Sequence, residues 1–244
     1  MTKAIALVVG LVRVDRNAPD YIKFDPGRKA GIEGCKDDAD RMETLLNKKG
    51  FDINKLLTEQ ATSESILKNI NDAASSLDNG DLFVFFFSGH GDQVPDKNGD
   101  ENDKSDEALA AYDRRIIDDE LPPLWAKFRP GVRILMISDT CHSGTIFRGQ
   151  ARRIEGFSLE APLQIKASLI HLAATHDSTD TLGAAGGSVF TNALLQVWER
   201  GNGSFPGDYN KFISEINDIT KSNSYLSMEG PNVATFAGQQ PFTV

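Results

Sequence analysis

Apolar runs alternate with helix-like patterns along most of the chain. Residues 4–11 are apolar without alternation, which is typical of a strand buried on both faces of a parallel sheet. Residues 36–49 follow with apolar positions at helical spacing, and Gly50 ends that pattern. The strand expected at 81–87 carries four phenylalanines and is the most strongly indicated strand, aromatic and buried. Further strands are expected at 51–57, 133–137 and 168–174, and further helices at 62–77, 119–127 and 190–200. This alternation predicts βαβ units and a three-layer α/β fold.

Two segments lack such patterns. Residues 93–106 are acidic and rich in Gly and Asn, which predicts a solvated surface loop. Their acids resemble the spacing of a calcium-binding EF-hand from Asp96 to Glu107, but Gly99 stands at the fourth position rather than the sixth. We therefore interpret this segment as a loop and not as an EF-hand. Residues 201–244 hold several glycines and prolines, and we expect them to be rich in loops.

Charge and cysteine content narrow the class of partner. The chain has 26 Lys and Arg against 35 Asp and Glu, a net charge of −9, which disfavours nucleic-acid binding and suits a basic peptide. Two cysteines are too few for a disulfide framework, so we expect a reducing, cytoplasmic setting. The apolar run at 4–11 lacks a signal-peptide cleavage site, and no apolar run is long enough to span a membrane. We expect a monomer without membrane contacts.

Candidate chemistry follows two of the expected strands. The strand at 81–87 leads into Ser88-Gly-His90-Gly, and the strand at 133–137 leads into Ser-Asp-Thr-Cys141-His-Ser-Gly. Functional groups of parallel α/β sheets gather beyond the carboxyl ends of the strands. Both segments therefore place a reactive side chain where active sites form, beside glycines that let a ligand approach the backbone.

Cys141 and His90 together predict nucleophilic catalysis. An imidazole near a thiol favours the reactive thiolate, and Cys141 follows His90 by 51 residues, a spacing typical of caspase-type peptidases. Nearby backbone N–H groups would stabilise the oxyanion formed during acyl transfer. A lone buried cysteine or histidine is more often structural, and His142 is a rival base. The combination of both residues at two strand ends favours catalysis.

Six segments in order resemble those of metacaspases, the relatives of caspases in bacteria, fungi, plants and protozoa. The resemblance runs from the first strand to about residue 200. The segments are Gly34-Cys-Lys-Asp-Asp-Ala39, Ser88-Gly-His-Gly91, Asp100-Glu-Asn-Asp-Lys-Ser-Asp-Glu107, Ile117-Asp-Asp-Glu120, Asp139-Thr-Cys-His-Ser-Gly144 and Gly187-Ser-Val-Phe-Thr191.

The resemblance implies one caspase-like catalytic domain over 1–244, with a six-stranded, mostly parallel sheet flanked by helices. It divides into a large-subunit-like region at about 1–150 and a small-subunit-like region at 151–244. By the same resemblance, Cys141 attacks the scissile carbonyl and His90 acts as acid and base. The N–H groups of Gly91 and Cys141 would form the oxyanion hole, and no cofactor is required.

Metacaspases cut after Arg or Lys, and the residues of their specificity pocket correspond here to Cys35, Asp38, Ser88 and Asp139. Two carboxylates beside the nucleophile would attract a guanidinium or ammonium group and repel an acidic side chain. The alternative for Asp38 is an ordinary acid near a helix N-terminus, where the helix dipole favours it.

Many metacaspases need calcium, and three of its ligands correspond to Asp106, Asp118 and Asp119. The fourth acid of the family lies seven residues after the nucleophile, where this chain has Arg148. An arginine removes an oxygen ligand and adds a repulsive charge, so calcium dependence stays open, with the balance slightly against it.

Basic residues after the nucleophile also suggest self-cleavage, the alternative being a solvated loop; they are Arg148, Arg152, Arg153 and Lys166.

Three other functions remain to be distinguished. A related peptidase would prefer a different residue before the cut. A non-catalytic caspase-like interaction module would not need Cys141 and His90, both of which this chain retains. A nucleotide-binding protein would share the fold class but would carry a Gly-x-Gly-x-x-Gly turn or a P-loop after the first strand, and neither is present.

Overall fold

A six-stranded sheet forms the centre of the computed structural model, which describes residues 2–22, 33–95, 105–140, 164–174 and 186–244. Five strands are parallel and the sixth, β9, pairs antiparallel with β8 at one edge. In spatial order the strands are β2 (Asp52–Leu57), β1 (Ala4–Gly10), β3 (Leu82–Ser88), β7 (Arg133–Asp139), β8 (Ser168–Ala173) and β9 (Tyr225–Glu229). The expected six-stranded, mostly parallel sheet is confirmed.

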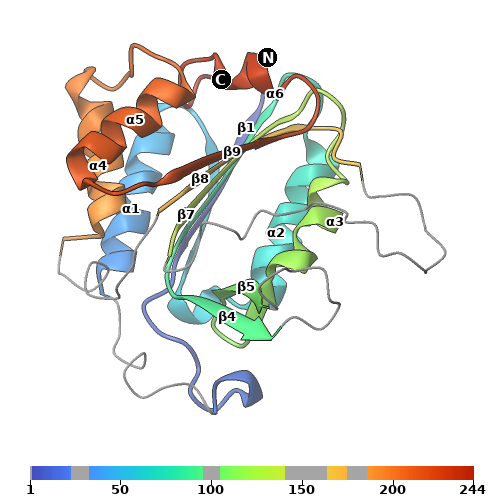
Figure 1. Ribbon diagram of the computed structural model, residues 1–244. Coiled ribbons are helices and arrows are strands. Elements are labelled where there is room, and N and C mark those ends of the chain that lie inside the picture. Colours follow the sequence, from blue (N-terminus) through green and yellow to red (C-terminus); the bar gives the residue numbers. More distant parts are fainter. Residues whose placement is uncertain (1, 23–32, 96–104, 141–163, 175–185) are drawn as a thin grey trace.

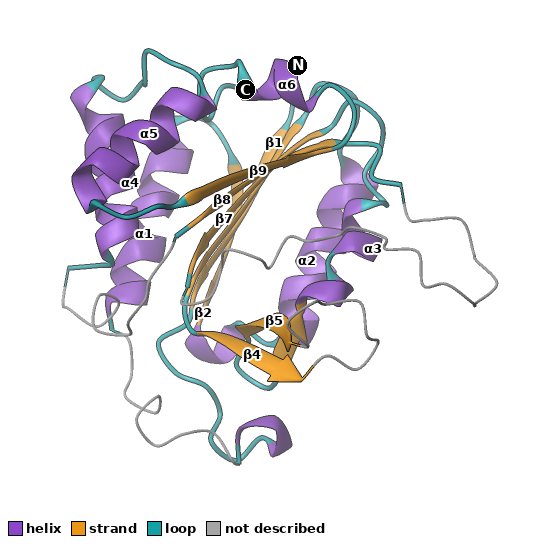
Figure 2. Ribbon diagram, in the orientation of Figure 1, coloured by secondary structure: helices purple, strands orange, loops and turns teal. Residues whose placement is uncertain are grey.

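Helices cover both faces of this sheet, as Figure 2 shows. One face packs against α1 (Gly34–Lys48), α4 (Val189–Arg200) and α5 (Tyr209–Thr220), and the other against α2 (Ser63–Ser76) and α3 (Pro122–Trp125). The side chains of β3 alternate between the two cores, and all seven of its residues are buried. Burial on both faces explains why the strand sequence lacks polar alternation. None of the helices in these described ranges is long and apolar enough to cross a bilayer.

A second, three-stranded sheet lies below the carboxyl ends of the parallel strands in Figure 1. It is antiparallel and contains β4 (Gly91–Pro95), β5 (Ser105–Ala110) and β6 (Arg115–Ile117). The prediction of a solvated loop over 93–106 is therefore wrong at both ends of that segment. Asp106 and Glu107 are each 3% exposed, because pairing with β4 and β6 draws this acidic strand into the protein.

The C-terminal part also differs from its prediction. Residues 201–244 were expected to be rich in loops, but they form α5, β9 and the short helix α6 (Val233–Ala237). Asp208 caps α5 by accepting a hydrogen bond from the Lys211 N–H, and the apolar stripe of this helix packs on the sheet. The helix expected at 119–127 is limited to the 3-10 turn η4 (Asp118–Glu120) and the single turn of α3.

Candidate active site

The two strand ends that carry the candidate chemistry are neighbours. Strands β3 and β7 pair in parallel with Ser88 opposite Asp139, and the Gly89 N–H donates to the Asp139 carbonyl at 3.3 Å. His90 and Cys141 each lie two residues beyond this last pair. Cys141 itself lies outside the described residues, as do its neighbour His142 and the arginines of the expected cleavage region. The register therefore places the ends of β3 and β7 side by side, as far as Ser88 and Asp139.

His90 is anchored through its backbone. Its carbonyl accepts a hydrogen bond from the Ala110 N–H at 3.0 Å, and Gly91 begins β4 directly after it. The His90 side chain is only 5% exposed. Its neighbour Gly89 leaves no space for a larger residue, since a Cβ there would lie 2.8 Å from the ring of Phe87. This tight turn fixes the direction in which the chain leaves β3.

A different histidine lies near the end of β7 but is poorly suited to be a base. The Nε2 atom of His171, on β8, is 2.6 Å from Oγ of Ser138. Burial lowers the pKa of His171 to about 3, so its imidazole stays neutral near pH 7. A general base needs a pKa near the working pH, and this residue therefore has a structural role.

The four residues of the expected specificity pocket lie at the same end of the sheet. Cys35, Asp38, Ser88 and Asp139 are all fully buried. The Ser88 hydroxyl donates to Oδ2 of Asp38 at 2.9 Å, which joins α1 to the end of β3. A Cβ on Gly10 would lie 2.6 Å from the Cys35 carbonyl oxygen, so β1 and α1 approach very closely here.

Two residues without an expected role complete this cluster. The backbone N–H of Ser188 donates to Asp38, at 3.0 Å to Oδ1 and 3.2 Å to Oδ2, while its hydroxyl donates to Oδ2 of Asp139. Thr191 donates to the same Oδ2 through its N–H at 3.2 Å and its hydroxyl at 2.6 Å. The sequence marks both residues through the metacaspase-like segment 187–191 and through Ser188 as a possible helix cap, but neither signal indicates these partners.

The charge of Asp139 acts on the titration of Asp38. Burial, reinforced by the negative charge of Asp139, raises the pKa of Asp38 to about 7, although the hydrogen bonds from Ser88 and Ser188 and the charge of Arg41 oppose this shift. Asp38 thus titrates near neutral pH, so an entering cation would favour its ionised form.

The acids expected to bind calcium lie near one another. Burial raises the pKa of Asp118 to about 8, and the charges of Glu107, Asp119 and Asp106 contribute to that shift. Glu107 also belongs to this group, although it is not among the calcium ligands that the resemblance implies. Within the described ranges, however, no three His, Cys, Asp or Glu side chains are arranged to hold a metal ion. The described residues thus gather negative charge around Asp118.

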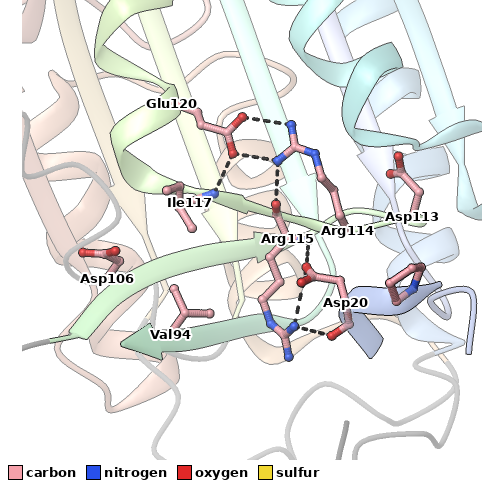
Figure 3. A pocket seen from close by; sticks show the side chains of 9 residues that line it. Asp20, Val94, Asp106, Asp113, Arg114, Arg115, Ile117 and Glu120 are labelled. Atoms are coloured by element: carbon pink, nitrogen blue, oxygen red, sulfur yellow. Dashed lines mark hydrogen bonds and ion pairs between the residues drawn. The ribbon is translucent and has the colours of Figure 1, made fainter. Parts of the chain in front are cut away.

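A cavity of about 430 Å³ lies beside the small sheet (Figure 3). Asp106 contributes to its wall, but none of the four pocket residues does. Arg114 binds Glu120 through two hydrogen bonds of 2.7 and 2.9 Å, and Arg115 donates to the Asp20 carbonyl at 2.6 Å. Because neither His90 nor any of the four pocket residues lines it, the cavity is distinct from the site at the strand ends.

Comparison with known proteins extends over nearly the whole chain. A family described as the caspase domain matches residues 4–236, which reaches beyond the expected limit near residue 200. Metacaspase-4 of Arabidopsis thaliana is 37% identical over 130 residues, which cover 49% of this chain and 31% of that protein. Metacaspase-1A of Aspergillus fumigatus is 37% identical over 134 residues, which cover 49% of this chain and 32% of that protein. The match thus spans about a third of these relatives' length.

A solved structure matches the full length. The crystal structure of a protein from Geobacter sulfurreducens is 31% identical and superposes with a TM-score of 0.80, covering 99% of each chain. Helix α5 and strand β9 lie within the family match, and α6 ends one residue beyond it.

Proposed function

Because the chain belongs to the caspase-domain family of cysteine peptidases, we propose that it hydrolyses peptide bonds after Arg or Lys, with Cys141 as nucleophile and His90 as general acid and base. The observation that carries this proposal is the pairing of Ser88 with Asp139. That pairing puts the ends of β3 and β7, the strands that lead to His90 and Cys141 in the sequence, side by side, and it supports the proposal together with the burial of Asp38 and Asp139.

The proposed reaction proceeds in two acyl-transfer steps. The thiol proton of Cys141 passes to His90, and the sulfur attacks the scissile carbonyl carbon to form a tetrahedral oxyanion. The N–H groups of Gly91 and Cys141 stabilise that oxyanion. Its collapse breaks the C–N bond, and His90 gives its proton to the leaving amine. His90 then takes a proton from water, whose oxygen attacks the thioester carbonyl carbon. Collapse of this second intermediate breaks the C–S bond and releases the acid, and His90 returns the proton to the sulfur of Cys141.

Specificity for basic residues rests on Asp38 and Asp139. Both carboxylates are fully buried beside the end of β7, and the side chain of Asp38 already lies in the field of Asp139. An arginine or lysine side chain would neutralise this repulsion, whereas an aspartate would increase it. The net charge of −9 favours basic protein substrates in the same way.

Several further properties belong to the proposal. The chemistry requires no cofactor, because a thiol and an imidazole supply both nucleophile and acid–base catalysis. The enzyme acts as a monomer in the cytoplasm, where its thiol stays reduced.

The chain divides into a large-subunit-like region at about 1–150 and a small-subunit-like region at 151–244, which supplies β8 and β9 to the same sheet.

Fluorogenic peptides ending in Arg, Lys, Asp or Asn test this proposal with the wild type, Cys141→Ala and His90→Ala. We expect turnover of Arg and Lys peptides that both substitutions abolish. Turnover of Asp or Asn peptides instead would identify a related peptidase with another preference. A protein that turns over no peptide but binds a caspase-like partner would be an interaction module.

A further inference from the structure

The N-terminus of α4 holds both carboxylates of the candidate specificity pocket. Ser188 contacts each of them, with its backbone N–H on Asp38 and its hydroxyl on Asp139. Thr191, one turn later, donates to Asp139 through its N–H and its hydroxyl. The side chains of Ser188 and Thr191 are 1% and 0% exposed, so water does not compete for these bonds.

These contacts exceed what a helix needs for capping. Oγ of Ser188 already accepts the Thr191 N–H at 3.0 Å, which is an ordinary N-cap bond. Helix α5 is capped in the same way by the single side chain of Asp208. At α2, Thr62 is the cap, and the N–H and hydroxyl of Ser63 also donate to Asp113, at 2.6 and 2.9 Å. At α4 the Thr191 N–H has a second acceptor, the carboxylate of Asp139. The Thr191 hydroxyl donates to the same carboxylate, and capping does not require that bond. The additional donors therefore serve the carboxylate.

Two buried carboxylates close together repel each other and tend to move apart or take up protons. Donors in fixed positions oppose both tendencies. On Oδ2 of Asp139 three donors converge, and the positive end of the α4 dipole adds to their effect. Asp38 receives the Ser188 N–H and the Ser88 hydroxyl. Ser188 thus fixes the position of one carboxylate relative to the other.

We propose that Ser188 and Thr191 are positioning residues for substrate specificity, which hold Asp38 and Asp139 in the arrangement that receives an arginine or lysine side chain. This inference rests on the proposed function and names the residues through which α4 controls it. Neither residue acts on the scissile bond; each acts through the carboxylates that it binds.

Binding of a labelled peptide tests this inference separately from catalysis. A fluorescein-labelled peptide with one central Arg is titrated into Cys141→Ala protein, and its anisotropy gives the Kd. A second peptide with a central Asp measures binding that does not depend on the basic side chain. In this background, Thr191→Val removes the hydroxyl at nearly constant volume and Thr191→Ser keeps it. Ser188→Ala removes the other hydroxyl.

We expect Thr191→Val and Ser188→Ala to weaken binding of the Arg peptide about ten-fold or more, because each leaves a buried carboxylate short of a donor. Thr191→Ser should restore binding to within about three-fold of the Thr191 protein. In the active enzyme the same variants should raise KM more than they lower kcat. Thr62→Ala and Asp208→Ala remove caps remote from the pocket, and they should lower Tm while leaving the Kd unchanged.

Two results would overturn the inference. A lower Tm of Ser188→Ala and Thr191→Val, as in the remote cap variants, with an unchanged Kd for the Arg peptide would limit both residues to a structural role. Equal binding of the Arg and Asp peptides by the parent protein would show that no basic pocket exists. Loss of turnover in the wild type with intact selective binding of the Arg peptide would instead contradict the proposed catalysis and leave the positioning role standing.

Discussion

A Cβ atom on Gly187 would lie 2.3 Å from Oδ1 of Asp38, much closer than two non-bonded atoms approach. Gly187 has a φ of +92°, and this conformation presents the N–H of Ser188 to Asp38. The absence of a side chain at Gly187 is thus what allows the segment before α4 to reach the buried carboxylate.

Gly187→Ala should therefore disrupt the pocket. The methyl group would displace Asp38 or Ser188 and break the bond between them, and we expect at least ten-fold lower kcat/KM on an Arg peptide. Gly186→Ala is the matched control: its φ is +107°, but a Cβ there meets nothing within 4 Å. Both variants carry backbone strain of about 1–3 kcal/mol, so only the clash distinguishes them. Equal activity of the two variants would contradict this explanation.

Removing the Asp139 carboxylate should abolish selection for basic residues. Asp139→Ala and the more conservative Asp139→Asn should lower kcat/KM on Arg and Lys peptides by about 30-fold to several thousand-fold, corresponding to the roughly 2–5 kcal/mol lost with a buried charge partner. Circular dichroism should show a folded protein, and iodoacetamide should still alkylate Cys141. Undiminished turnover by Asp139→Asn would exclude this residue from the pocket.

The pH dependence of stability should report the titration of Asp38. Its pKa rises from an ordinary 3.8 to about 7 in the folded protein, so between these values the folded state holds a proton that the unfolded chain has released. Its contribution to the free energy of unfolding must then fall as pH rises through this window and level off above pH 7. In urea unfolding, the free energy of unfolding of Asp38→Asn should rise by about 2–3 kcal/mol relative to that of the wild type when the pH is raised from 5 to 8. Parallel behaviour of wild type and variant would contradict the shift; Asp37→Asn, in the same turn of α1, is the control.

Calcium should have little effect on this protein. Arg148 stands where the family has a fourth acid, and the acids of the described chain are not arranged as metal ligands. We expect equal Tm and equal activity in calcium and in excess chelator. A calcium-dependent rise in Tm that Asp118→Asn removes would show that the acidic cluster of Asp106, Glu107, Asp118 and Asp119 does bind the ion.

Self-cleavage is expected after the basic residues that follow the nucleophile. Wild-type protein should convert to two fragments on storage, whereas Cys141→Ala should stay at full length. Mass spectrometry should place the new ends after Arg148, Arg152 or Arg153, and replacing these arginines by alanine should prevent cleavage. A wild type that stays intact under conditions of full activity would refute processing.

The sequence determined the parts of this protein that depend on local pattern. Unbroken apolar runs such as 81–87 predict strands buried on both faces, and the two glycine-flanked segments after 81–87 and 133–137 indicate where the reactive residues lie. The same reasoning failed for 201–244. There Gly and Pro in the turns obscured an amphipathic helix, and β9 is recognisable only from its pairing with β8.

Tertiary structure alone decided how the pocket is held. Asp38 and Ser188 lie 150 residues apart and Asp139 and Ser188 lie 49 apart, so no local pattern relates them. Ser188 reads in the sequence as an ordinary helix cap, because its spacing to Thr191 is what capping requires. The sheet register and the packing of α4 against α1 bring two repelling carboxylates to that cap, and long-range packing of this kind leaves no periodic signal in the chain.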